Sequence, residues 1–145
     1  WDTHSNNDDT QSQSWESLFS GLLDMTDRLA ALPGRNTTTL LDETVIVVLS
    51  EMGRTPQLND QDGKDHWPYT SAMVVGPGIT GSRVIGATDD FYYGRRIDPM
   101  SGELFEGAGS IELSTASFGA TLLNLAGVEH DPYLSGVSSI PGVLL

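Results

Sequence analysis

TVIVVLS, residues 44–50, runs directly into EMGRTP, residues 51–56, and this stretch decides the fold of the chain. The apolar run is rich in β-branched residues and has acidic residues before it and a Gly/Pro turn after it. This pattern predicts a strand buried on both faces, as in a parallel sheet. Ligands of open α/β sheets bind beyond the carboxyl ends of the strands, so Glu51 and Arg54 are candidate site residues.

The chain has 145 residues, which is a typical length for a single domain. It begins at Trp1 without an initiator Met, and residues 1–4 have the character of a strand whose beginning is missing. We therefore expect this sequence to be a portion of a longer polypeptide.

The amino-acid composition limits which partners the protein can bind and which side chains can hold a metal. The chain carries 7 Lys+Arg against 20 Asp+Glu, for a net charge of -13, which repels nucleic acid and anionic membrane surfaces. No stretch approaches the ~18 consecutive apolar residues of a membrane span. With 0 Cys, any metal must be held by His, Asp and Glu side chains.

Local signals predict the other elements. Ser5–Ser14 is polar and is interpreted as a solvated loop, with Ser14 capping an amphipathic helix that starts at Trp15 and stops at Pro33-Gly34. Apolar runs predict strands at 71–75 and around 82–86, and residues 91–109 are interpreted as an irregular excursion or hairpin. A last helix is predicted over Thr115–Ala126, with Ser114 as its N-cap and Gly127 closing it.

Three places could carry chemistry, and each has a plainer alternative. Asp2 and His4 lie two apart, so an extended segment projects both from one face, unless the terminus is simply frayed. Glu51 and Arg54 follow the buried strand, although they could form a local pair that fixes the turn. Asp65-His66 could be a loop anchor.

These candidates gain weight in combination. Two of the three His residues stand beside acidic residues in loops near predicted strand ends. A cysteine-free divalent-metal site needs two or three such side chains. His130, after the last helix, is interpreted as part of a surface turn.

The order of motifs resembles a known family. WDTH (1–4), an amphipathic helix, SEMGRTP (50–56) and GKDHWP (63–68) are similar to the C-terminal part of the bacterial family called domain of unknown function 1501. That family is related to the alkaline phosphatase and sulfatase superfamily. The resemblance covers nearly the whole chain. It implies that residues 1–145 are the C-terminal portion of a single domain, built on a doubly wound, mostly parallel sheet with flanking helices, whose N-terminal half is missing here.

The resemblance also implies roles for individual residues. Asp2, His4 and His66 stand where the superfamily binds one divalent metal, for which we expect zinc first and manganese or calcium as alternatives. Glu51 occupies the position of an aspartate ligand, and Asp65 could add an oxygen ligand.

Two neighbours of Glu51 complete these assignments. Arg54 is the candidate catalytic residue, because a guanidinium fork matches tetrahedral phosphate or sulfate oxygens. Met52 stands where the superfamily has a histidine, and its soft thioether does not suit such ions.

The expected function is therefore part of a metal-dependent hydrolase of phosphate or sulfate esters, acting on a small-molecule or polymer ester. Family members are commonly exported, which implies a periplasmic or extracellular location. The residue Met52 motivates the alternative of a non-catalytic exported protein that binds a ligand or forms part of a surface assembly. A third, plainer interpretation is an acidic α/β domain with solvated polar residues.

Overall fold

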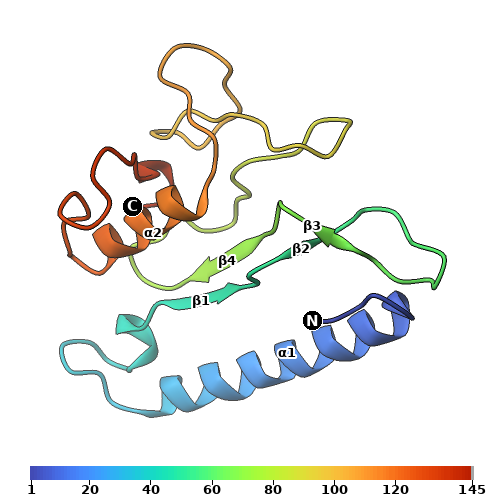
Figure 1. The fold of residues 1–145 in the computed structure, drawn as a ribbon. Helices are drawn as coiled ribbons and strands as arrows, with labels where there is room; N and C mark the ends of the chain where they lie inside the picture. Colours follow the sequence, from blue (N-terminus) through green and yellow to red (C-terminus); the bar gives the residue numbers. More distant parts are fainter. Residues whose placement is uncertain (145) are drawn as a thin grey trace. The chain divides into compact units, whose positions relative to one another are not determined.

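The computed structural model describes residues 1–144, and the chain clusters into two units that divide between Pro77 and Gly78. The first unit carries the long helix and all the strands, and the second carries the shorter helix (Figure 1). The class is mixed α/β, with small antiparallel sheets and two α-helices among the described residues.

The long helix α1 spans Asn7–Ala31. The prediction of a loop over Ser5–Ser14 is therefore wrong, because the helix begins well before Trp15. Asp8 and Asp9 in the first turn favour its positive end. The backbone N–H of Asn7 donates to the carbonyl of Asp62 at 2.8 Å, which ties the helix start to a distant loop. The helix ends before Pro33-Gly34, as predicted.

The strands form one long hairpin (Figure 1). A short 3-10 turn, η1 (Leu41–Glu43), leads into β1 (Ile46–Leu49), which continues through a bend into β2 (Gly53–Arg54). The chain then returns through β3 (His66–Trp67) and β4 (Ala72–Val75).

Pairing within this hairpin is antiparallel throughout. Ile46 lies opposite Val75 in the β1–β4 pair, and Arg54 lies opposite His66 in the β2–β3 pair. The predicted parallel sheet is not seen within residues 1–144, because a parallel neighbour needs a long crossover and the chain instead folds straight back. The strand predicted at 71–75 is confirmed.

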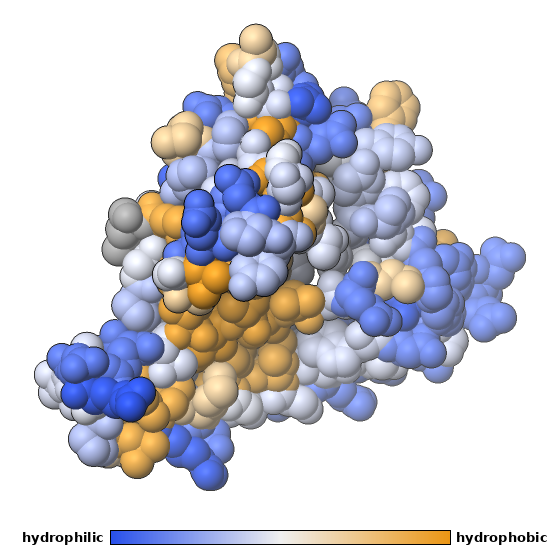
Figure 2. Space-filling view, turned by 60° about the vertical axis from the view of Figure 1, so that its left-hand side comes forward, coloured by the Kyte–Doolittle hydropathy of each residue, from blue (hydrophilic) through white to orange (hydrophobic). Residues whose placement is uncertain are grey.

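The predicted burial of β1 on both faces is not seen either. Its residues are half-buried up to Leu49, which is 60% exposed, and Val75 on β4 is 49% exposed. Apolar surface is visible in the space-filling view (Figure 2).

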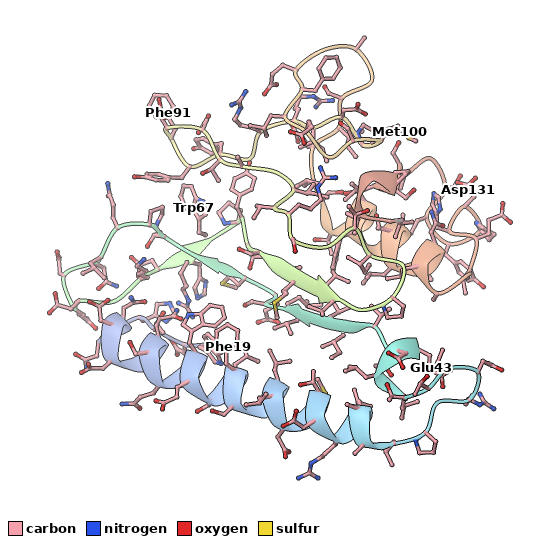
Figure 3. The ribbon with its side chains drawn as sticks, turned by 180° about the vertical axis from the view of Figure 1, so that it is seen from behind. Phe19, Glu43, Trp67, Phe91, Met100 and Asp131 are labelled. Atoms are coloured by element: carbon pink, nitrogen blue, oxygen red, sulfur yellow. The ribbon has the colours of Figure 1, made fainter. Side chains whose placement is uncertain are left out.

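Helix α1 runs along one side of the hairpin in both ribbon views, and Phe19 projects on the side that faces the strands (Figure 3). The rings of Trp15 and Phe19 stack with centroids 5.5 Å apart, and Trp1 meets Trp15 edge-on at 4.9 Å. Trp1 therefore packs against α1, and residues 1–4 have no regular secondary structure. They do not form the predicted strand.

The second unit contains helix α2 (Thr115–Leu125) and irregular loops. Ser114 caps the helix in a reciprocal capping box with Ser117, and Gly127 follows with φ +72°, so both predicted ends are confirmed. Residues 82–86 form no strand. Ile97 is fully buried and bridges to Leu104 within the irregular excursion and to Ile111 just after it.

A second 3-10 turn, η2 (Pro141–Val143), follows near the end of the described chain. Within residues 1–144, neither α-helix combines the length and the apolar character that crossing a membrane requires.

Candidate functional site

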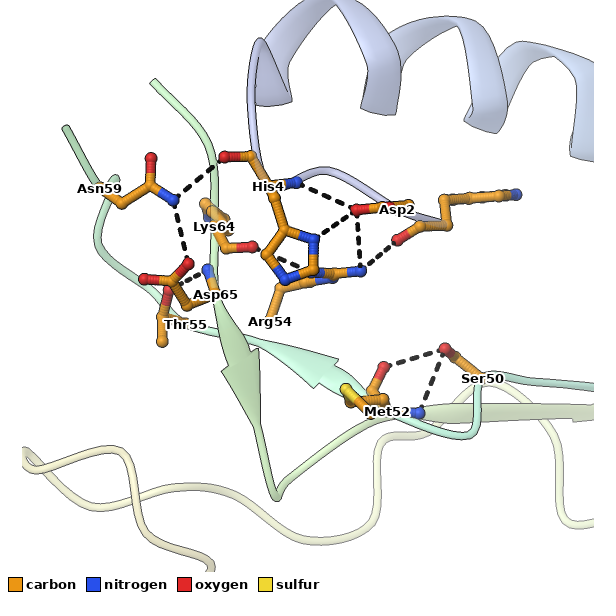
Figure 4. A network of polar contacts seen from close by, with 10 residues as sticks. Asp2, His4, Ser50, Met52, Arg54, Thr55, Asn59, Lys64 and Asp65 are labelled. Atoms are coloured by element: carbon orange, nitrogen blue, oxygen red, sulfur yellow. Dashed lines mark hydrogen bonds and ion pairs between the residues drawn. The ribbon is translucent and has the colours of Figure 1, made fainter. Parts of the chain in front are cut away.

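Three segments of the first unit meet at one end of α1 (Figure 4). They are the N-terminal residues 1–5, strand β2 with its following loop, and residues 59–66. Their contacts join residues that lie more than fifty positions apart in the sequence, such as His4 and Asn59. The site is therefore a product of tertiary structure.

A close backbone approach at Gly63 makes this meeting possible. A Cβ atom added at Gly63 would lie 1.9 Å from the carbonyl oxygen of His4, so a side chain cannot be accommodated there without a shift of the backbone. Next to it, the backbone N–H of Lys64 donates to the carbonyl of Thr3 at 2.7 Å, and Thr3 is fully buried. These contacts anchor the segment that carries Asp2 and His4.

Asp2 and His4 form a direct pair, as their spacing predicted. The Asp2 carboxylate contacts His4 Nδ1 and also accepts from the His4 backbone N–H at 3.3 Å. The hydrogen bond from the His4 side chain, followed by the one from its backbone, lowers the pKa of Asp2, and the charge of Arg54 adds to this. Asp2 is therefore ionised over the whole neutral range.

Arg54 is the centre of the site and is only 17% exposed. Its Nη1 lies 3.2 Å from both ring nitrogens of His4 and donates to the carbonyl of Lys64 at 3.1 Å. Its Nη2 donates to the carbonyl of Trp1 at 2.9 Å and lies 3.6 Å from the Asp2 carboxylate. The role of Arg54 is thus long-range. It does not form the alternative local pair with Glu51 that would merely fix the turn.

His66 joins the site from β3. It stands directly opposite Arg54 in the antiparallel pair, which places both side chains on the same face. The rings of His66 and His4 lie with centroids 4.8 Å apart at an angle of 57°. The chain therefore brings together two of its three His residues.

Asp65 is linked to His4 through Asn59. The Nδ2 of Asn59 donates to the Asp65 carboxylate at 3.0 Å and to the His4 carbonyl at 3.1 Å. Thr55 holds the Asp65 backbone at both ends, donating from its own N–H at 2.9 Å and accepting at its hydroxyl at 3.1 Å. A hollow of about 320 Å³ opens here, lined by His4, Asn59, Asp60, Gln61 and Asp65.

Asn59 is a site residue that sequence reasoning missed. Its Oδ1 accepts from the backbone N–H groups of Gln61 and Gly63, each at 2.9 Å, which is the local Asx-turn geometry. The signal in the sequence was an Asn at the head of a turn-forming Asn-Asp-x-Asp-Gly segment. That signal marks a turn, and it does not indicate that the same amide reaches His4 and Asp65.

Within the described residues 1–144, Glu51 and His130 take no part in the contacts of this cluster. Glu51 is exposed in the bend between β1 and β2, and within residues 1–144 its side chain makes none of the contacts that join the others. His130 belongs to the second unit, where Nδ1 meets Asn124 at 2.8 Å and Nε2 meets the carbonyl of Val137 at 3.0 Å. These two contacts fix the turn after α2.

The donor types present suit a divalent cation. Asp2, His4, Asp65 and His66 supply oxygen and imidazole ligands without a thiolate, which is a chemistry that fits zinc or manganese. Asp2 contacts His4, the His4 and His66 rings lie close together, and Asp65 contacts Asn59. Within the described residues 1–144, no group of three or more His, Asp or Glu side chains is placed to hold a metal ion.

Comparisons with known proteins agree with the resemblance of the motifs. Searches of curated proteins and of solved structures found no match. A family model described as "Protein of unknown function (DUF1501)" matches residues 1–136, which include every residue of the site described above. The chain therefore belongs to the DUF1501 family.

Proposed function

We propose that this chain is part of a metal-dependent hydrolase of phosphate or sulfate esters. The observation that carries the proposal is the convergence of Asp2, His4, Arg54 and His66 from three separate segments. In this proposal the scaffold is alkaline phosphatase- or sulfatase-like. Further segments of the same polypeptide complete a doubly wound sheet around the hairpin, and residues 1–145 form its C-terminal portion.

Arg54 is the proposed contact for the anionic group of the substrate. A guanidinium presents paired N–H donors that match the oxygens of phosphate or sulfate. Arg54 is 17% exposed and is held by the carbonyls of Trp1 and Lys64, so its position is fixed before a substrate arrives. A fixed donor stabilises charge in a transition state without further reorganisation.

Asp2, His4 and His66 are the proposed ligands of one divalent ion, with Asp65 as a further oxygen ligand. Imidazole favours zinc, whereas a larger carboxylate share favours manganese or calcium. The ion, when bound, would polarise the ester oxygen and stabilise the charge that develops on it.

Arg54 influences this metal site. Because its Nη1 lies 3.2 Å from both ring nitrogens of His4, the guanidinium repels a cation placed at His4. An anionic ester offsets both positive charges. The pairing of Arg54 with His4 thus favours occupation of the site by metal and anion together, which is the combination that ester hydrolysis requires. The family resemblance adds the proposal of export to the periplasm or the cell exterior.

The test uses the complete natural polypeptide that carries this sequence. Bound metal is measured by elemental analysis, and turnover is measured with aryl phosphate and aryl sulfate esters in the presence of zinc, manganese or calcium. We expect His66→Ala to lose both metal and turnover. The matched control is His130→Gln, which changes an imidazole of the second unit and should retain both. Full metal occupancy in His66→Ala would contradict the assignment of His66 as a metal ligand.

A second candidate function rests on Met52. Its thioether stands where the superfamily places a histidine, and it is a poor ligand for a hard or borderline ion. A non-catalytic exported protein that binds an anionic ligand, or that forms part of a surface assembly, would keep Arg54 and need no second metal. Binding of inorganic phosphate or sulfate by calorimetry, without turnover of any ester by the complete polypeptide, favours this candidate.

A further inference from the structure

Another hollow of the first unit lies along α1, beside the N-terminus marked in Figure 1. Its volume is about 480 Å³, within the roughly 300–1,000 Å³ that is usual for small-molecule pockets. The residues that line it are Trp1, Thr10, Gln13, Ser14, Ser17 and Leu18, and we call it the Trp1 hollow. The chain has 20 Asp+Glu and 7 Lys+Arg residues, yet the lining contains none of them.

The polar part of the lining comes from one face of α1. Thr10 and Ser14 are four residues apart, and so are Gln13 and Ser17, which places the side chains of each pair next to one another in successive turns. Leu18 adds an apolar side chain beside them. The hollow therefore presents three hydroxyl groups and one amide group from a single regular element.

The hydrogen-bonding groups of this face are available to a ligand. Helical hydroxyls commonly donate to a carbonyl of the preceding turn, and on α1 those of Ser12 and Thr26 do so at 2.7 and 2.9 Å. Within residues 1–144, the four polar side chains of the Trp1 hollow make no hydrogen bond of this or any other kind. A ligand can therefore bond to them without displacing a contact within the protein.

Trp1 supplies the aromatic side of the hollow and is held at two points. Its ring meets Trp15 edge-on with centroids 4.9 Å apart, and its carbonyl accepts from Arg54 Nη2 at 2.9 Å. The residue is nevertheless 48% exposed. An aromatic surface that is already fixed loses little conformational freedom when a ligand packs against it. The Trp1 hollow thus combines a fixed ring with neutral hydrogen-bonding groups.

We infer that the Trp1 hollow binds the pyranose ring of a neutral sugar. A flat indole ring packs against the C–H groups of a sugar ring, and hydroxyl and amide side chains both donate to and accept from its hydroxyl groups. A purely apolar ligand would take water from these side chains without replacing its hydrogen bonds, and a charged ligand would find no opposite charge in the lining. The inference goes beyond the proposed function, because none of the lining side chains takes part in the proposed ester hydrolysis.

The test titrates the complete natural polypeptide with the methyl pyranosides of glucose, galactose and mannose, and binding is measured by ligand-observed NMR. We expect at least one of these sugars to bind. Cyclohexanol, a six-membered ring with a single hydroxyl group, should bind at least about 10-fold more weakly, because it forgoes two or more hydrogen bonds.

Gln13→Ala and Ser17→Ala test the polar side of the hollow while preserving the fold, because both residues are exposed and alanine is the best helix former. Each should weaken sugar binding by about 2- to 10-fold, the range of one hydrogen bond. Trp1→Ala should weaken it by about 10-fold by removing the aromatic surface. Ser20→Ala is the matched control, since Ser20 is exposed on the same helix outside the lining, and it should leave the affinity unchanged.

The inference is overturned if none of the three pyranosides binds the complete polypeptide, or if the double variant Gln13→Ala/Ser17→Ala binds them as tightly as the wild type does. Cyclohexanol binding as tightly as the sugars would also overturn it, because the hollow would then be an apolar contact surface. A crystal structure with another segment of the same polypeptide in the Trp1 hollow would identify that segment as the occupant in place of a sugar.

Discussion

Gly63→Ala is expected to detach the N-terminal segment from the site loop. The new Cβ would lie 1.9 Å from the His4 carbonyl oxygen and 2.0 Å from its carbonyl carbon, whereas ordinary contact begins at 3.4 Å. These are backbone atoms, so no change of rotamer relieves the clash. Gly63 does not have a positive φ, and the effect therefore comes from space alone and involves no strain in the alanine backbone.

The magnitude follows from the bonds that cross this contact. A backbone shift of about 1.5 Å is required, the difference between 3.4 and 1.9 Å. Such a shift breaks the bond from Lys64 N to Thr3 (2.7 Å) and the bond from Asn59 to His4 (3.1 Å), and it stretches the bond from Arg54 to Trp1 (2.9 Å). Since each bond contributes about 0.5–1.5 kcal/mol, weakening all three lowers the free energy of unfolding by up to about 1.5–4.5 kcal/mol.

The assay is urea unfolding of the complete polypeptide, combined with hydrogen exchange of the Lys64 amide. Gly21→Ala is the matched control in the same unit, because nothing lies within 4 Å of its added Cβ on α1. There alanine should stabilise by roughly 0.5–1 kcal/mol, since glycine is a weak helix former. If Gly63→Ala unfolds at the wild-type urea concentration with the Lys64 amide still protected, the close approach does not hold the site together.

Further predictions concern the charges of the site and the second helix. Arg54→Ala should lower the free energy of unfolding by roughly 2–4 kcal/mol in urea titrations, because it leaves two backbone carbonyls unpaired, whereas Arg28→Ala on exposed α1 should stay within about 0.5 kcal/mol. In metal-free protein, a carboxyl NMR titration should place the pKa of Asp2 below its usual 3.8. The stabilisation contributed by ionised Asp2 is then fully present above pH 3.8 and is lost as the pH falls through the lowered pKa. An Asp2 pKa at or above 3.8 would contradict the pairing with His4. Ser114→Ala should cost about 1 kcal/mol by removing the cap of α2, and an unchanged thermal midpoint would show that the cap contributes nothing.

Several elements could be predicted from the sequence because their signals are local. Ser114 and Gly127 mark the ends of α2 through hydrogen bonds and dihedrals that involve only a few neighbouring residues. The apolar run before Glu51 marks β1, and the stop at Pro33 marks the end of α1. Each signal acts within a turn or two of backbone.

The start of α1 was mispredicted for a related reason. Residues 7–14 are polar, and polarity alone favours a loop. The helix extends over them because Asn7 is tied to Asp62, a contact that no local window contains. Propensity was outweighed by tertiary hydrogen bonding.

The candidate site shows the same division. Residue types, strand-end positions and the family resemblance predicted Asp2, His4, Arg54, Asp65 and His66 as candidates, and the structure joins these five in one network of contacts. Glu51 was placed by analogy with a ligand position, and the hairpin leaves it in an exposed bend. The position of Glu51 along the chain did not by itself determine whether its side chain joins the site.

By itself, the sequence determined the family, the two helices in outline, the positions of β1 and β4 and the types of side chain available for chemistry. Only the tertiary structure decided that the strands pair antiparallel, that Arg54 lies against His4 fifty positions away, and that Asn59 links His4 to Asp65. The physical reason is the range of the forces involved. Caps, turns and periodicity act between near neighbours, whereas these contacts depend on a backbone approach at Gly63 that exists only once the distant segments have met.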